Sequence, residues 1–68
     1  MKNLKRLQKK AFHMVKIGNY FVHMAETSRL LLKISEAHVK VIQGNNDYEI
    51  GCTFPYYGGY MGIEYTEA

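Results

Sequence analysis

Positively charged side chains dominate the first quarter of the chain, and no acid accompanies them. Residues 1–25 contain six lysines and arginines but no aspartate or glutamate. Ammonium and guanidinium groups neutralise nucleic-acid phosphates, and each neutralised phosphate adds a salt-dependent increment of affinity. We therefore predict a phosphate-binding surface formed by Lys2, Lys5, Arg6, Lys9, Lys10, His13 and Lys16.

The types of basic residue in this set indicate how specific nucleic-acid binding would be, and which other partners the set could bind. Seven of the nine basic residues in the chain are lysines, which act as point charges rather than as bidentate readers of base edges. Binding to nucleic acid should therefore be only weakly sequence-specific. The same charges would suit an acidic protein surface, and a solvated helix face without a partner is the third interpretation.

Three tyrosines gather near the C-terminus in the segment PYYGGYMG. Tyr56, Tyr57 and Tyr60 surround a pair of glycines. Their rings could stack on unpaired bases, anchor a protein interface or fold back over a thin core. From residue 44 onward the chain holds four acids and no base, which disfavours phosphate contact there. We therefore expect these tyrosines to face away from a nucleic acid and to contact a protein.

A second candidate protein interface lies in the middle of the chain. Leu32, Val39 and Ile42 form a partly apolar flank beside the main apolar face of a predicted helix. A chain of 68 residues has little material with which to cover so wide a face. We therefore expect a homo-oligomer, which the basic front and the acidic back of the chain would also favour.

The sequence gives little support for catalysis or for a bound cofactor. Cys52 is the only cysteine, and with His13, His23 and His38 it shows none of the close-paired spacings of a zinc site. No base can be assigned to activate Cys52, and the glycines of the tyrosine segment lack the lysine of a P-loop. We therefore expect no enzymatic activity, no cofactor and no metal.

The periodicity of the first two thirds predicts two amphipathic helices. Charged residues recur at steps of three and four from Lys2 to Lys16, so we predict a basic amphipathic helix over residues 3–17. A second polar stripe runs from Glu26 to Gln43. It predicts a helix that begins near residue 20 or residue 27 and ends at residue 43.

The last third predicts a β-hairpin. The stretches YEIGCTF and YMGIEY alternate apolar and polar residues on either side of a glycine-rich turn. We place the two strands at residues 48–54 and 60–66. The predicted fold is therefore α+β, with two helices followed by a C-terminal hairpin (α-α-β-β) in a single domain over residues 1–68.

A β-rich alternative stays open beside this fold. The stretch HMVKIGNYFVHM has two apolar runs around a Gly-Asn pair, and HVKVIQGNNDYEIGC has two candidate strands around a polar turn. Both are typical of hairpins, and the β-branched residues of HVKVI favour a strand. The alternative order is α-β-β-α-β-β, with an N-terminal helix.

The predicted function follows from these features. The first candidate is a small, non-enzymatic protein that binds nucleic acid through its basic segment. The alternative is a small regulator or inhibitor of another protein, of the kind viruses direct at host proteins, acting through the tyrosine hairpin and the basic segment. We find no unbroken apolar run long enough for a signal sequence or a membrane span, and we expect a cytoplasmic protein.

Overall fold

The chain forms one antiparallel sheet. A computed structural model describes residues 3–68, which contain six strands and two short 3-10 turns. The elements are β1 (Leu4–Ala11), η1 (Phe12–Met14), β2 (Tyr20–His23), β3 (Glu26–Ser35), β4 (His38–Gln43), η2 (Asp47–Glu49), β5 (Thr53–Pro55) and β6 (Met61–Glu67). The strand order in the sheet is β1-β6-β2-β3-β4-β5. Among residues 3–68, no helix is long and apolar enough to cross a membrane.

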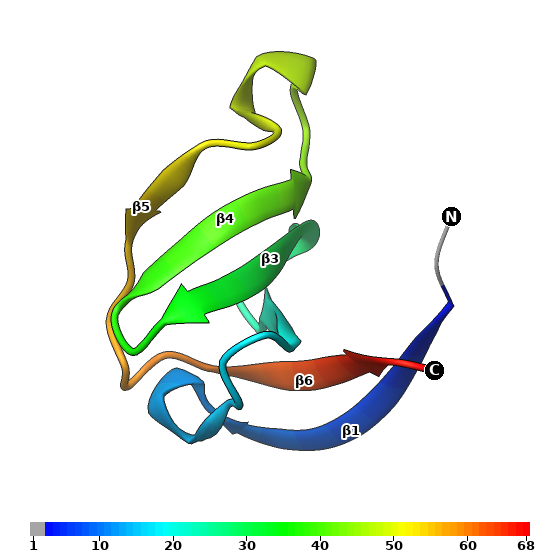
Figure 1. Ribbon diagram of the computed structural model, residues 1–68, viewed down its shortest axis with the longest axis vertical. Coiled ribbons are helices and arrows are strands. Elements are labelled where there is room, and N and C mark those ends of the chain that lie inside the picture. The colour runs from blue at the N-terminus through cyan, green and yellow to red at the C-terminus, as the bar shows by residue number, and fades with distance from the viewer. Residues whose placement is uncertain (1–2) are drawn as a thin grey trace.

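The sheet is strongly curved. Figure 1 shows β3, β4 and β5 on one side of the molecule and β6 and β1 on the other. Strand β2 joins these two halves, because it pairs with β3 along one edge and with β6 along the other. The curvature turns one face of the sheet inward, and the core forms on that face.

Both predicted helices are wrong. Residues 3–17 form strand β1 and the turn η1, and the segment assigned to the second helix forms β2, β3 and β4. The α+β prediction and its basic amphipathic helix are therefore corrected to a β-rich domain. The β-rich alternative has the right class, although its helices are also absent from residues 3–68.

A bulge in β1 explains why this strand looked helical. Arg6 pairs with Tyr65 and Lys9 pairs with Ile63, so three steps along β1 match two steps along β6. A bulge interrupts the two-residue alternation of a strand. As a result the half-buried Leu4 and Leu7 lie three residues apart, as on a helix.

The predicted C-terminal hairpin is also corrected. Strands do occur near both predicted positions, but β5 pairs with β4 and β6 lies between β1 and β2. Residues 48–52 belong to η2 and the turn after it rather than to a strand. Around Gly18 and Asn19 the chain likewise forms no hairpin, because η1 precedes this turn and β2 follows it.

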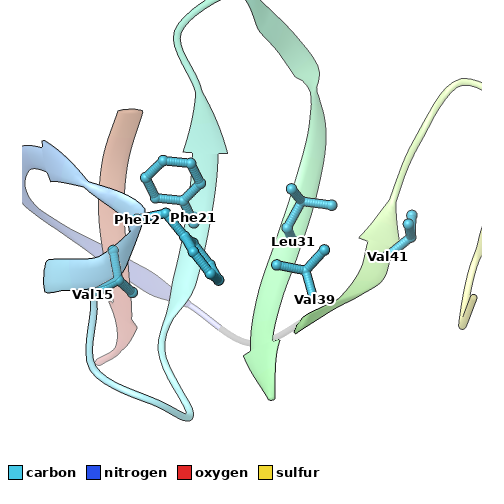
Figure 2. Packing of buried hydrophobic residues seen from close by; sticks show 6 residues of the cluster. All are labelled: Phe12, Val15, Phe21, Leu31, Val39 and Val41. Atoms are coloured by element: carbon cyan, nitrogen blue, oxygen red, sulfur yellow. The ribbon is translucent and has the colours of Figure 1, made fainter. Parts of the chain in front are cut away.

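The core lies on the inward face of the sheet and under the loop that follows β1. Phe12 and Phe21 pack with their rings edge to face, at a centroid separation of 5.5 Å. The buried residues of this cluster are Phe12, Val15, Phe21, Leu31, Val39 and Val41 (Figure 2). Phe54 and Tyr56 pack against the cluster and close it from the side of β5.

Gly62 allows the central pairing of β6 with β2. A Cβ atom at this position would lie 2.2 Å from the backbone oxygen of Val22 and 2.5 Å from Cζ of Phe21. Both distances are far shorter than any non-bonded contact, so only glycine fits here. The absence of a side chain lets the Phe21 ring approach the backbone of β6 closely.

Candidate nucleic-acid interface

Strand β1 presents most of the predicted phosphate contacts along one edge of the sheet. It pairs only with β6, and its other side borders no strand formed by residues 3–68. Lys5, Arg6 and Lys9 are exposed on this strand. None of these three side chains forms an ion pair with another described residue. Their charges are therefore available to a ligand.

The cations leave β1 on both faces of the sheet. Lys5 lies opposite Thr66, which is two residues from Glu64 and therefore shares its inward face by alternation. Arg6 and Lys9 lie opposite Tyr65 and Ile63, whose side chains point to the outer face by alternation. A charged backbone that runs along the strand edge can therefore meet cations from either side.

Lys10 differs from its neighbours because Glu64 neutralises it. Glu64 is only 3% exposed, and its Oε1 forms an ion pair with Nζ of Lys10. Its Oε2 accepts hydrogen bonds from Nδ2 of Asn19 at 2.9 Å and from the backbone N of Lys16 at 3.0 Å. Burial alone would raise the pKa of this carboxyl, but the hydrogen bonds from Lys10, Asn19 and Lys16 together lower it. Lys10 therefore has a structural role.

The remaining members of the predicted basic set follow or precede the strand. His13 and Lys16 are exposed in the segment after β1. Glu64 accepts a hydrogen bond from the backbone N of Lys16 and not from its side chain. Lys2 lies outside the described residues. The structure thus brings Lys5, Arg6 and Lys9 together on one edge and continues that edge toward His13.

Lys33 is a buried structural cation, although the sequence pattern placed it in the polar stripe from Glu26 to Gln43. Its side chain is 0% exposed, and Nζ donates hydrogen bonds to the carbonyl oxygens of Phe12 at 3.0 Å and Val15 at 2.8 Å. Nζ also lies 4.6 Å from the centroid of the Phe12 ring, which is cation–π distance. Lys33 therefore fixes the turn η1 and removes itself from any surface. The preceding run Leu30-Leu31-Leu32 was the available signal for burial.

The tyrosine segment divides into a half-buried ring and two exposed rings. Tyr56 packs edge to face on Phe12 at 4.9 Å and covers the core. Tyr57 is 68% exposed and Tyr60 is 42% exposed. The ring of Tyr60 touches those of Tyr56 at 4.9 Å, Tyr57 at 5.3 Å and His23 at 4.8 Å. Burial is the main cause that raises the pKa of Tyr56 to about 12.

A shallow groove of about 490 Å³ opens beside these rings. Its lining is mostly aromatic and apolar, and comprises His23, Ala25, Glu26, Arg29, Phe54, Pro55, Tyr56 and Tyr60. His23 is held in place because its Nδ1 accepts a hydrogen bond from the backbone N of Ala25 at 2.9 Å. The groove is therefore a preformed aromatic surface.

Two carboxylates surround the one guanidinium in this groove. Arg29 donates to both carboxylate oxygens of Glu49, from Nε at 3.3 Å and from Nη2 at 3.2 Å, and pairs with Glu26 at 3.2 Å. It also lies 5.7 Å from the Phe54 ring centroid. The side-chain hydrogen bond with Glu49 is the main cause that raises the pKa of Arg29. This end of the groove would repel a phosphate.

The basic edge and the tyrosine segment meet, contrary to the expectation from sequence. The backbone N of Phe12 donates to the oxygen of Tyr60 at 2.8 Å, and that of His13 donates to Gly58 at 2.9 Å. The chain that leaves β1 therefore runs directly beside the tyrosines. Sequence reasoning could not find this contact, because residues 12 and 60 are far apart along the chain.

The predicted interface residues of the middle segment separate between the two faces of the sheet. Val39 is fully buried in the core. Leu32 and Ile42 are half-buried on the outer face, since Leu32 pairs with the exposed Lys40.

Within residues 3–68, no three histidine, cysteine, aspartate or glutamate side chains gather closely enough to hold a metal ion.

None of the protein-family models, curated proteins or solved structures compared with this chain matches it.

Proposed function

We propose that this protein binds nucleic acid without sequence specificity, through the phosphate backbone and without catalysis. The observation that carries the proposal is the edge strand β1, with Lys5, Arg6 and Lys9 exposed and without ion pairs to described residues. From Lys5 to Ala11 the strand β1 spans roughly 20 Å at the rise of an extended strand. That length matches several successive phosphates.

The chemistry of this edge favours phosphates over a protein partner. Lysines are depleted in protein–protein interfaces, whereas they are common contacts to phosphates. A lysine is also a point charge with a flexible stem, so it follows a backbone without reading bases. Lysines on an edge strand additionally prevent edge-to-edge pairing of sheets, a structural role that is compatible with binding.

The test is a salt titration of binding. Fluorescence anisotropy of labelled DNA and RNA should give an affinity that falls log-linearly with salt concentration. The double variant Lys5→Gln, Lys9→Gln should bind more weakly and should reduce the salt slope by about 1.4 to 1.8, since each contact contributes about 0.7 to 0.9.

A matched pair of single variants separates contact from net charge. Lys9→Gln and Lys40→Gln each remove one exposed lysine, but Lys40 lies on β4, four positions from β1 in the strand order. Lys9→Gln should weaken binding and Lys40→Gln should leave it nearly unchanged. Equal effects of the two variants, or no binding by the unmodified protein at low salt, would overturn the proposal.

A further inference from the structure

We infer that the nucleic acid bound by this protein is single-stranded, and that its unpaired bases stack on Tyr57 and Tyr60 and enter the aromatic groove beside them. This inference rests on the proposed function and adds to it the strandedness of the ligand and the site for its bases. The observation that supports it is that the cationic edge strand β1 leads directly to the aromatic groove beside Tyr60. The edge is positively charged, whereas the groove is neutral to acidic.

The junction between the two surfaces is fixed by the backbone. Ala11, the last residue of β1, pairs with Met61, and the hydrogen bond from Phe12 N to Tyr60 O continues this pairing past the end of the strand. A ligand backbone that follows the lysines of β1 therefore reaches the tyrosines within a few residues. At about 3.3 Å per residue, Lys9 and Phe12 are separated by roughly 10 Å.

The exposed rings are oriented rather than free. Tyr60 is held by edge contacts with Tyr56 and His23, and Tyr57 leans on Tyr60 with the ring planes at 84°. Gly59 permits this arrangement, because a Cβ atom there would lie 2.4 Å from Cε2 of Tyr57. Rings fixed before binding lose little conformational entropy when a base stacks on them.

The charges of the groove suit a base and exclude a phosphate. Glu26 and Glu49 outweigh the single charge of Arg29, so this end of the site is neutral to acidic. Nucleobases are flat and uncharged, and they stack on aromatic side chains. A ligand must therefore separate its charged backbone, on β1, from its uncharged rings, in the groove. A single strand can do this, whereas a duplex keeps its bases paired and stacked inside.

The experiment compares strandedness and ring chemistry. We would titrate the full chain against labelled single-stranded oligonucleotides of about ten residues and against the matched duplex at one low salt concentration. The single strand should bind more tightly. The double variant Tyr57→Leu, Tyr60→Leu should bind the single strand about 5- to 100-fold more weakly, and should bind the duplex as the unmodified protein does.

Two control variants and one fluorescence measurement complete the test. Tyr57→Phe, Tyr60→Phe keeps both rings and should retain single-strand affinity. Tyr48→Leu removes a tyrosine that is 81% exposed in η2, outside the groove lining, and should have no effect. The chain has no tryptophan, so quenching of tyrosine fluorescence by the oligonucleotide reports stacking directly, and this quenching should fall in the leucine variant.

The outcomes distinguish this inference from the proposed function. Equal affinity for single strand and duplex, or unchanged single-strand affinity in the leucine variant, would overturn the inference and leave phosphate binding intact. Equal losses in the leucine and phenylalanine variants would also overturn it, because stacking would not be the cause. No binding to either ligand would overturn the proposed function itself.

Discussion

At the scale of single residues, two buried charges of opposite sign organise the segment after β1. Lys33 and Glu64 do not pair with each other. Lys33 binds the carbonyls of η1, and Glu64 binds Lys10, Asn19 and the backbone of Lys16. A buried charge is tolerated only when hydrogen bonds replace its lost water. Here both charges gain those bonds from the segment between β1 and β2, residues 12–19. These bonds fix the segment in place, so that Phe12 and Val15 are buried in the core.

Replacing Lys33 should destabilise the domain markedly. In Lys33→Met the carbonyl oxygen of Val15 loses the donor that Lys33 supplies, at a cost of about 1–3 kcal/mol, and that of Phe12 keeps only the hydrogen bond from the backbone N of Val15. We expect the free energy of unfolding to fall by about 2–4 kcal/mol, a large part of what a domain of this size has. Urea denaturation would measure it. Lys40→Met, at an exposed site on β4, is the control, and equal stability of the two variants would refute the assigned role.

Glu64 should make the domain sensitive to acid. The folded-state pKa of this carboxyl is lowered, so its contribution to stability is present above the ordinary value of 4.5 and is lost as the pH falls through the folded value. Glu64→Gln should cost about 1–3 kcal/mol at neutral pH, because the hydrogen bonds lose their charge assistance. The difference between this variant and the unmodified protein should shrink toward low pH. Urea denaturation at several pH values tests this, and a constant difference would contradict it.

At the scale of elements, irregular strand pairing gives some strands a sequence pattern that resembles the pattern of a helix. The pairing of β3 with β4 shifts twice, between Leu30 and Leu31 and again between Lys33 and Ser35. The pairing of β3 with β2 also shifts, because five steps from Glu26 to Leu31 match two steps along β2. The two-residue alternation is therefore interrupted in the part of β3 where the polar stripe of helical spacing begins. Lys33 strengthened this misreading, because a lysine in a periodic pattern is normally assigned to solvent.

Some features were nonetheless readable from local patterns. The alternation and β-branching of HVKVI correctly favoured a strand, and β4 buries Val39 and Val41 while exposing His38 and Lys40. The exposed basic edge could also be anticipated, since six bases without an acid cannot be buried. The strand partners could not be read from the sequence, because the residues of β6 pair with residues of β1 and β2 that lie 39 to 63 positions earlier in the chain. For the same reason the meeting of the basic edge with the tyrosines required the fold.

Gly62 should be the least replaceable position of β6. In Gly62→Ala the new methyl group would collide with the backbone oxygen of Val22, which cannot rotate away as a side chain could. We expect a loss of about 1–3 kcal/mol from this overpacking, together with a weaker pairing of β2 with β6. Thermal unfolding followed by circular dichroism would measure it, with Met61→Ala, an exposed position on the same strand, as the control. An unchanged melting temperature in Gly62→Ala would show that the strands separate more easily than the structure implies.

At the scale of the whole molecule, the curved sheet separates two kinds of surface. The cationic edge β1 lies at one end of the strand order, and β5, which carries Phe54 into the groove, lies at the other. Curvature brings the two ends near each other around the aromatic cluster. Tyr56 lies at this closure, because its ring contacts Phe12 after β1, Phe21 on β2 and Phe54 on β5. The same ring therefore supports the core and the floor of the groove.

This position of Tyr56 predicts an alkaline limit to the stability of the fold. The pKa of its phenol is raised to about 12 from 10, mainly by burial, so the folded state favours the neutral form. The resulting stabilisation is complete below pH 10 and is lost as the pH rises toward about 12, because the unfolded chain ionises this tyrosine first. Tyr56→Phe keeps the ring contacts but cannot ionise. Its melting temperature should therefore fall less between about pH 8 and pH 11 than that of the unmodified protein. Tyr48→Phe, at an exposed site, should follow the unmodified protein. If Tyr56→Phe also follows it, ionisation of Tyr56 does not limit the stability of the fold at alkaline pH.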